Sequence, residues 1–258
     1  MRRVIYTLRQ FGLDPIRLMK AIRFIPRYWN NYISFRIKSP KSTKVKIQPS
    51  LSDFNDSAGS ADGHYFWQDL VCAQWINEEN PAMHLDVGSR VDGFIAHLLA
   101  SREVTLIDIR PLKHKIQGLT VVVGDIQSQM HNNPQSSPSV SSLHSIEHFG
   151  LGRYMDPIDP LGHEKGLLNL AGLVADGGCL YVSFPIGTEI VEFNSQRIID
   201  PLWPQNLLKD FTLERFVLIP WKGIPIENLK PEQVDCSVFG QAGLYQFKKQ
   251  LNRSQDKI

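Results

Sequence analysis

Short apolar runs alternate with segments of helical periodicity from residue 82 to residue 247, and polar turns separate them. Continuous apolar runs are typical of strands that are buried on both faces of a parallel sheet. Helices over 94–100 and 165–173 supply the right-handed crossovers that parallel strands need. We therefore expect an α/β domain over 64–250, with a doubly wound, mostly parallel sheet whose last strand runs antiparallel. The seven predicted strands cover 82–87, 104–107, 119–123, 140–143, 179–184, 211–219 and 238–247.

Upstream of this domain, apolar and basic residues interleave with roughly helical spacing over residues 5–36. Pro15 and Pro26 interrupt that spacing, so we expect two or three short amphipathic helices in a basic helical extension over 1–37. Residues 38–63 are rich in Ser, Pro, Asp and Gly and are expected to form a linker. A helix over 64–77 should follow it, residues 127–139 should form a polar loop, and residues 251–258 a polar tail.

Charge is distributed unevenly along the chain. Residues 1–50 hold twelve of the 28 Lys and Arg and one of the 26 Asp and Glu, a formal charge of +11, whereas residues 51–258 carry −9. A basic amphipathic helix with aromatic residues can lie on an anionic membrane surface, which makes such a surface a candidate partner of residues 1–37. Packing on the domain or on a partner protein is the alternative. Nucleic acid is not expected, because no nucleic-acid-binding motif accompanies the charge.

Cysteine usage and hydropathy bear on the compartment. Cys72, Cys179 and Cys236 are dispersed and form no CxxC pair, which favours reduced thiols in a cytoplasmic protein. No apolar run reaches the length of a membrane span, and the Arg-rich start lacks the apolar core of a signal peptide. We therefore expect a cytoplasmic location, with the basic extension as a possible peripheral contact to the inner face of the membrane.

Candidate chemistry gathers directly after the predicted strands, where open parallel sheets bind their ligands. The first strand passes into an acid-x-Gly turn at Asp86 and Gly88, and Asp108 follows the second strand twenty residues after Gly88. That is the spacing at which nucleotide-binding α/β folds place an acid for a ribose hydroxyl. Asp125 follows the third strand. Acids at three successive strand ends favour a nucleotide-like ligand, although each one could instead cap a helix or pair with a nearby arginine.

The order of these segments resembles class I S-adenosylmethionine-dependent methyltransferases, over about residues 80–250. The resemblance implies a Rossmann-like methyltransferase sheet and S-adenosylmethionine as the cofactor. It places Asp86 and Gly88 at the methionine part of that cofactor, Asp108 at its ribose and Asp125 at its adenine. The cofactor-binding residues expected on this basis are Asp86, Gly88, Ser89, Arg90, Gly93, Asp108, Ile109, Gly124, Asp125, Ile126 and His144.

A narrower resemblance is to a little-characterised methyltransferase-like family associated with bacterial surface-polysaccharide genes. It implies O-methyl transfer to a small-molecule or glycan acceptor, such as a sugar or a polysaccharide-related intermediate. The segments that carry it are DPIRLMKAIRFIPRYW (14–29), DVGSRVDGF (86–94), SLHSIEHFGLGRYMDPIDPLGHEKGL (142–167) and VEFNSQRI (191–198).

The glycine loop departs from the methyltransferase pattern. Arg90 and Asp92 stand where two glycines are usual, and Gly93 follows one place late. Arg90 could bind the methionine carboxylate through a charge-assisted fork, which would preserve the cofactor. It could equally occupy the cofactor's space, and the protein would then be a catalytically inactive binding or scaffold protein. A dehydrogenase is a further alternative, but only the outer two glycines of its Gly-x-Gly-x-x-Gly fingerprint are present.

The segment 142–163 concentrates ionisable residues near the end of the fourth strand. Methyl transfer to a hydroxyl needs a base, so we expect His148 in that role with Glu147 to orient it. His144, Glu147 and His148 also fit the HxxEH pattern of zinc peptidases. We expect no metal, because Gly150 follows at once and a parallel sheet precedes the motif. The predicted acceptor-binding residues are Arg153, Tyr154, Asp156, Asp159 and His163.

Overall fold

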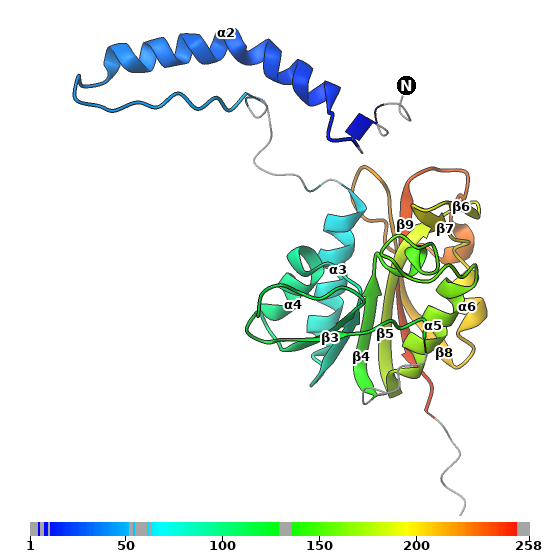
Figure 1. Ribbon diagram of the computed structural model, residues 1–258. Helices are drawn as coiled ribbons and strands as arrows, with labels where there is room; N and C mark the ends of the chain where they lie inside the picture. The colour runs from blue at the N-terminus through cyan, green and yellow to red at the C-terminus, as the bar shows by residue number, and fades with distance from the viewer. Residues whose placement is uncertain are drawn as a thin grey trace, which may run out of the picture. The chain divides into compact units, whose positions relative to one another are not determined.

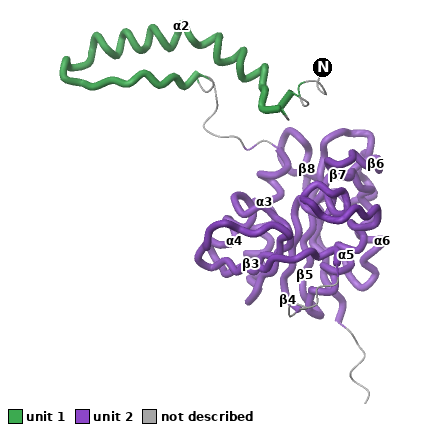
Figure 2. The backbone as a smooth tube through the Cα atoms, in the orientation of Figure 1, with its two compact units in different colours: residues 1–60 green, residues 61–258 purple. Residues whose placement is uncertain are grey.

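The computed structural model describes residues 5, 8, 9, 11–51, 54, 61, 63–128 and 136–251. Parts of the expected extension, linker, polar loop and tail therefore lie outside the described residues. By its internal contacts the chain divides into two units, residues 1–60 and residues 61–258 (Figure 2). Each unit is considered by itself below.

A seven-stranded sheet in the order β3-β2-β1-β4-β5-β9-β8 forms the centre of the second unit (Figure 1). Neighbouring strands from β3 to β5 pair in parallel, and β9 runs antiparallel to both β5 and β8. This confirms the expected doubly wound, mostly parallel sheet with an antiparallel last strand. The strands are β1 (His84–Val87), β2 (Val104–Asp108), β3 (Leu119–Val123), β4 (Ser137–Leu143), β5 (Val174–Ile186), β8 (Phe211–Ile219) and β9 (Gln241–Lys249).

Helices cover both faces of this sheet, which explains the continuous apolar runs within its strands. Ile107 of β2 belongs to one apolar cluster together with residues of α5 (Gly162–Gly172). Its neighbour Leu106 belongs to a second cluster together with residues of α3 (His64–Glu79) and α4 (Ala96–Leu99). Successive side chains of a strand point to opposite faces, so each cluster takes alternate residues. The crossover into α4 begins as a π-helical turn, Val91–Ile95.

The start of β4 corrects a sequence-based prediction. The polar stretch that ends at Ser139 was expected to be loop, yet β4 begins at Ser137. Its serines are buried and satisfied within the sheet, because the hydroxyls of Ser139 and Ser141 lie 2.7 and 2.9 Å from the two ring nitrogens of His84. Polar residues that satisfy each other in this way give no apolar signal in the sequence. The strand was therefore predicted too short.

The basic extension also differs from the prediction. One 24-residue helix, α2 (Pro15–Lys38), replaces the two or three short helices expected. Pro15 stands in the first turn, where no backbone donor is needed, and Asp14 caps the helix by accepting from the N–H groups of Ile16 and Arg17. Pro26 lies inside the helix on an exposed stretch, where water can satisfy the carbonyl that loses its donor.

Several short elements were not predicted. A hairpin of β6 (Ile190–Glu192) and β7 (Gln196–Ile198), the helix α6 (Trp203–Leu207), and the 3₁₀ turns Ile146–His148 and Pro231–Gln233 connect the main strands. Each is too short to show a periodicity in the sequence. Among the residues that the structure describes, no helix combines the length and apolar content needed to cross a membrane.

Candidate functional site

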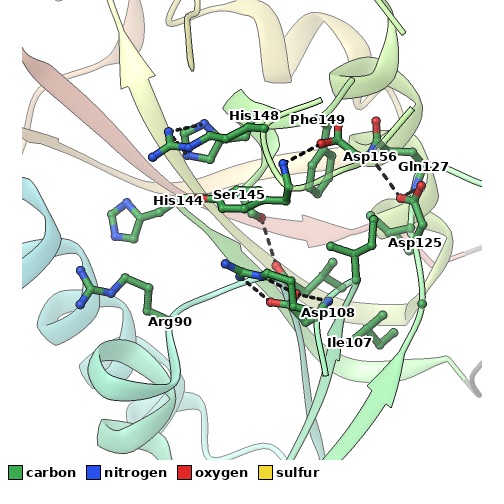
Figure 3. Close-up of a pocket in the computed structure, with 18 of the residues that line it drawn as sticks. Arg90, Ile107, Asp108, Asp125, Gln127, His144, Ser145, His148, Phe149 and Asp156 are labelled. Atoms are coloured by element: carbon green, nitrogen blue, oxygen red, sulfur yellow. Dashed lines mark hydrogen bonds and ion pairs between the residues drawn. The ribbon is translucent and has the colours of Figure 1, made fainter. Parts of the chain in front are cut away.

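A pocket opens at the carboxyl ends of β1 to β4, all within the second unit (Figure 3). Together with the open solvent at its mouth, it contains about 760 Å³ of space. Eight predicted cofactor-binding residues line it: Gly88, Arg90, Asp108, Ile109, Gly124, Asp125, Ile126 and His144. Lining residues that sequence reasoning did not assign to the site are Tyr65, Val87, Ile107, Arg110, Gln127, Ser145 and Phe149.

Asp86 does not line the pocket but lies fully buried beneath its first turn. Its carboxylate accepts hydrogen bonds from the N–H and hydroxyl of Ser89, at 3.0 and 2.7 Å, and from the hydroxyl of Ser141. Burial raises the pKa of Asp86 to about 7, although these hydrogen bonds act in the opposite direction. Asp86 and Ser89 thus stabilise the turn through their hydrogen bonds and do not line the pocket.

Two glycines permit the close packing around this turn. Gly88 has a φ of +74°, and a Cβ there would lie 2.9 Å from the Cβ of Ser145. A glycine is therefore required where the backbone forms the pocket floor. Gly93 does not line the pocket; a Cβ on it would collide with the carboxylate of Asp69 in α3. Its role is to let the π-helical turn approach that helix.

Arg90 stands at the pocket wall with its charge already paired. Its Nε and Nη2 donate to the two carboxylate oxygens of Asp92 at 3.1 and 2.9 Å, and its guanidinium lies 5.6 Å from the ring centre of Tyr65. Figure 3 shows the side chain directed away from Asp108 and Asp125. Arg90 therefore does not fill the space between the strand ends. The two residues that depart from the glycine pattern, Arg90 and Asp92, neutralise each other.

We expect Arg90→Ala to change the affinity of the pocket for S-adenosylhomocysteine by less than about threefold, because exposed ion pairs contribute little. Isothermal titration of wild type and variant measures this directly. Asp92→Asn, which frees the guanidinium without removing it, is the matched control. A loss of more than about tenfold in Arg90→Ala would show instead that the arginine itself binds ligand.

Asp108 is almost fully buried and is engaged by Arg110. The carboxylate accepts from the backbone N–H of Arg110 at 2.8 Å and from its Nε and Nη2 at 2.9 and 2.7 Å. The same guanidinium lies 4.4 Å from the ring centre of Tyr154, in the loop after β4. The carboxylate that was expected to bind a ribose is thus ion-paired with Arg110. The guanidinium of Arg110 is half-exposed, whereas the carboxylate is nearly buried.

The third strand end supplies a small polar corner. Asp125 accepts from the backbone N–H and side-chain amide of Gln127 at 2.9 and 3.2 Å. The neighbouring Ile126 is buried and belongs to the apolar cluster on the α5 side of the sheet. A carboxylate beside an apolar wall suits a flat heterocycle with an amino group.

His148 and Glu147 occupy the buried 3₁₀ turn after β4, and of the two His148 lines the pocket. Their Nε2 and Oε1 atoms are 3.6 Å apart. Arg153 Nη1 lies 3.3 and 3.4 Å from the two ring nitrogens of His148 and donates to the carbonyl of Ser195 at 2.7 Å. Among the described residues, Oε2 of Glu147 has no hydrogen-bond partner.

Burial sets the protonation states of this pair. It lowers the pKa of His148 to about 4, and the positive charge of Arg153 acts in the same direction. It raises the pKa of Glu147 to about 8. Near neutral pH the imidazole of His148 is therefore uncharged and Glu147 is mostly protonated. An uncharged imidazole at the pocket wall has the form that a proton acceptor needs.

His144 lies outside that turn and has a different set of partners. It adopts a left-handed backbone, with a φ of +58°, and its Nε2 lies 3.3 Å from the carboxylate of Asp69. Its ring centre is 4.2 Å from that of Tyr65. The helical turn covers only Ile146–His148, so His144 and His148 do not share the helical face that the zinc-peptidase pattern requires.

The predicted acceptor-binding residues divide into two groups. Arg153, Tyr154 and Asp156 line the pocket, and Asp156 also fixes its own loop by accepting from the N–H groups of Gly150 and Tyr154 at 2.8 and 3.2 Å. The structure does not bring the other two to the pocket wall. Asp159 pairs with Lys165 at 2.5 Å, and His163 stacks on Trp203 at 5.3 Å between ring centres.

Comparison with known proteins gives fold-level similarity. A family model described as "Caenorhabditis protein of unknown function, DUF268" matches residues 96–213. No curated protein matches the sequence significantly. Many solved structures resemble the chain. NodS, an N-methyltransferase from Bradyrhizobium japonicum WM9 in complex with S-adenosylhomocysteine, has a TM-score of 0.49 and 11% identity, over 73% of this chain and 89% of that one.

A second solved structure is similar over nearly the whole length of both chains. It is 1,6-didemethyltoxoflavin-N1-methyltransferase from Burkholderia thailandensis, with bound 1,6-didemethyltoxoflavin and S-adenosylhomocysteine. The TM-score is 0.50 and the identity 13%, over 89% of this chain and 90% of that one. At this identity the likeness concerns architecture. The chain has a Rossmann-like fold of the kind found in S-adenosylmethionine-dependent methyltransferases.

Proposed function

We propose that the protein binds S-adenosylmethionine in this pocket and transfers its methyl group to an acceptor. One observation carries the proposal: Gly88, Asp108 and Asp125 lie at the carboxyl ends of three adjacent strands of the sheet and line a single pocket. The strand ends of a doubly wound sheet are where such folds bind nucleotide-like ligands. The bound S-adenosylhomocysteine of the similar methyltransferase from Burkholderia thailandensis supports the choice of ligand.

The side chains present fit the proposed cofactor. Asp108 supplies a carboxylate for a ribose diol, and Ile107, Ile109 and Ile126 supply apolar surface for an adenine. The glycine at position 88 leaves room at the pocket floor that a Cβ would fill. S-adenosylmethionine would supply a methyl group on a sulfonium centre, open to displacement by a nucleophile.

The finer proposal concerns the acceptor. It is a hydroxyl of a sugar or polysaccharide-related intermediate, as the narrower sequence resemblance implies. His148 takes the hydroxyl proton with its uncharged imidazole, and Glu147, at 3.6 Å, orients that imidazole. Tyr154, 5.8 Å from His148 between ring centres, offers an aromatic surface beside the base. Formation of S-adenosylhomocysteine with free sugars, sugar phosphates and nucleotide sugars tests this choice, and activity only with amine acceptors would refute it.

The fork of Arg110 on Asp108 favours a second candidate function, a binding protein whose pocket stays closed to the cofactor. The two candidates predict different titrations. We expect wild-type protein to bind S-adenosylhomocysteine, and Arg110→Ala to bind it about two- to fivefold more tightly, because a half-exposed ion pair must be broken in the wild type alone. Isothermal titration calorimetry measures both affinities.

Lys113→Ala is the matched control, since Lys113 is an exposed cation that does not line the pocket. It should bind as the wild type does. Binding by Arg110→Ala alone would establish the closed-pocket candidate, and no binding by any variant at millimolar ligand would exclude S-adenosylmethionine. Weaker binding in Arg110→Ala would show that Arg110 contacts the ligand instead of competing with it.

A further inference from the structure

Helix α2 carries a continuous apolar stripe. The stripe consists of Leu18, Ile22, Ile25, Trp29, Ile33 and Ile37, spaced three or four residues apart. On a helix of 3.6 residues per turn these positions fall within about 120° of the circumference. Their exposed fractions range from 40% to 79%, and no residue of α2 is buried. Singly exposed apolar residues are common, but a stripe over the length of a helix marks an interaction surface.

A different side of α2 is covered within the first unit. Phe24 stacks on Phe54 with 5.2 Å between ring centres, and Arg27 lies 5.3 Å from the same ring. Near the end of the helix Arg36, whose position falls within the arc of the stripe, donates to the carbonyl of Thr43 at 3.2 Å as the chain turns back (Figure 1). Phe24 is half-buried as a result. The stripe is thus the apolar side that the returning segment leaves uncovered.

The charged residues of α2 are all cationic. The helix contains six Lys and Arg and no acid. Lys20, Arg23 and Arg27 lie close together around the helix, on the side away from the stripe. The segment that follows adds further cations, Lys41, Lys44 and Lys46. A second copy of this unit would bring an equal positive charge, which disfavours pairing between copies.

From this combination we propose that α2 docks the protein on the surface of an anionic phospholipid bilayer. The stripe enters the boundary between headgroups and acyl chains, the helix lies along the surface, and the basic side chains reach the phosphates of the headgroups. Trp29, in the middle of the stripe, is a residue type that favours this boundary. The inference is independent of the reaction proposed above.

Vesicle flotation of the full-length protein tests the proposal. We expect binding to vesicles of phosphatidylcholine with roughly 30% phosphatidylglycerol to be at least about tenfold stronger than to phosphatidylcholine alone, and to fall at about 0.5 M salt. The triple variant Ile22→Gln, Trp29→Gln, Ile33→Gln should bind at least about tenfold more weakly. It removes apolar side chains that enter the bilayer, and glutamine is a good helix former, so the helix itself is kept. Lys20→Gln with Arg23→Gln should weaken binding to the anionic vesicles only.

The matched control is Asn30→Gln with Asn31→Gln, two exposed polar residues outside the stripe, which should bind as the wild type does. Circular dichroism and titration with S-adenosylhomocysteine report on folding of both units separately from vesicle binding. Equal binding to neutral and anionic vesicles, or unchanged binding of the stripe variant, would overturn the proposal. A concentration-dependent dimer that only the stripe variant loses would assign the stripe to a second copy instead.

Discussion

Asp108→Asn is expected to weaken binding of S-adenosylhomocysteine by at least about 100-fold, the largest effect on ligand binding that the pocket predicts. A carboxylate that accepts both hydroxyls of a ribose makes charge-assisted hydrogen bonds, and an amide of the same shape can accept at one atom only. The side chain is only 10% exposed, so water cannot replace the lost acceptor freely. Isothermal titration of the variant gives the affinity, and thermal unfolding confirms that it is folded.

The loss of Asp108 also leaves Arg110 without its partner, so the effect must be separated from a misplaced cation. The same substitution is therefore made in the Arg110→Ala background, where a remaining loss of affinity is due to the missing carboxylate and not to an unpaired cation. Asp125→Asn makes the corresponding change at the end of β3. There the affinity for S-adenosylhomocysteine should fall by roughly tenfold or less, because the neighbouring apolar wall remains. Binding by Asp108→Asn within about threefold of the wild type would place the ribose elsewhere or exclude the cofactor.

The free energy of unfolding of the second unit is expected to vary with pH, because buried acids lower it as pH rises and buried histidines lower it as pH falls. On the alkaline side, burial raises the pKa of Glu147 from 4.5 to about 8 and that of Asp86 from 3.8 to about 7. The folded state then keeps protons that the unfolded state has released, so the free energy of unfolding decreases as pH rises through this window. On the acidic side, burial lowers the pKa of His64 and His148 from 6.5 to about 4. Below pH 6.5 the unfolded state therefore takes up more protons than the folded state, so the free energy of unfolding decreases as pH falls.

Glu147→Gln should remove much of the alkaline loss, on the order of 3 kcal/mol between about pH 5 and about pH 9, since a neutral amide has no proton to release. Urea unfolding at a series of pH values measures it. Glu103→Gln, at an exposed acid, is the matched control and should reproduce the wild-type curve. If Glu147→Gln keeps the full alkaline decrease, Glu147 is ionised in the folded protein at neutral pH.

The sheet was predictable because burial on both faces leaves a direct trace in the sequence. The apolar runs at β2, β3 and β8 match the observed strands within one residue. The beginning of β4 left no such trace, since its serines satisfy the buried ring of His84 across the sheet. Pro26 misled in the opposite direction, because it lies inside α2, where the helix is exposed and water can satisfy the carbonyl that loses its donor.

The location of the candidate site was predictable from the sequence, but the hydrogen-bond and ion-pair partners of its residues were less so. Strand ends gather at one edge of a parallel sheet, so the acids at β2 and β3 could be brought together from sequence alone. Asp86 lies beneath the turn because Ser89 and Ser141 hydrogen-bond its carboxylate, and the spacing of the motif does not reveal those partners. Tyr65 reaches the pocket from the start of α3, away from every strand end. The sequence predicted pairing with a nearby arginine as an alternative for the strand-end acids, but it did not identify Arg110 as the partner of Asp108.

Tyr154 has a consequence for how substitutions in the pocket combine. Its ring centre lies 4.4 Å from the guanidinium of Arg110 and 5.3 Å from that of Arg153, which in turn contacts His148. The side chain at the end of β2 and the imidazole after β4 are therefore members of one chain of touching groups. Free-energy changes in such chains do not add. The energetic cost of altering Asp108 will depend on whether His148 is intact, so neither residue has a fixed contribution of its own.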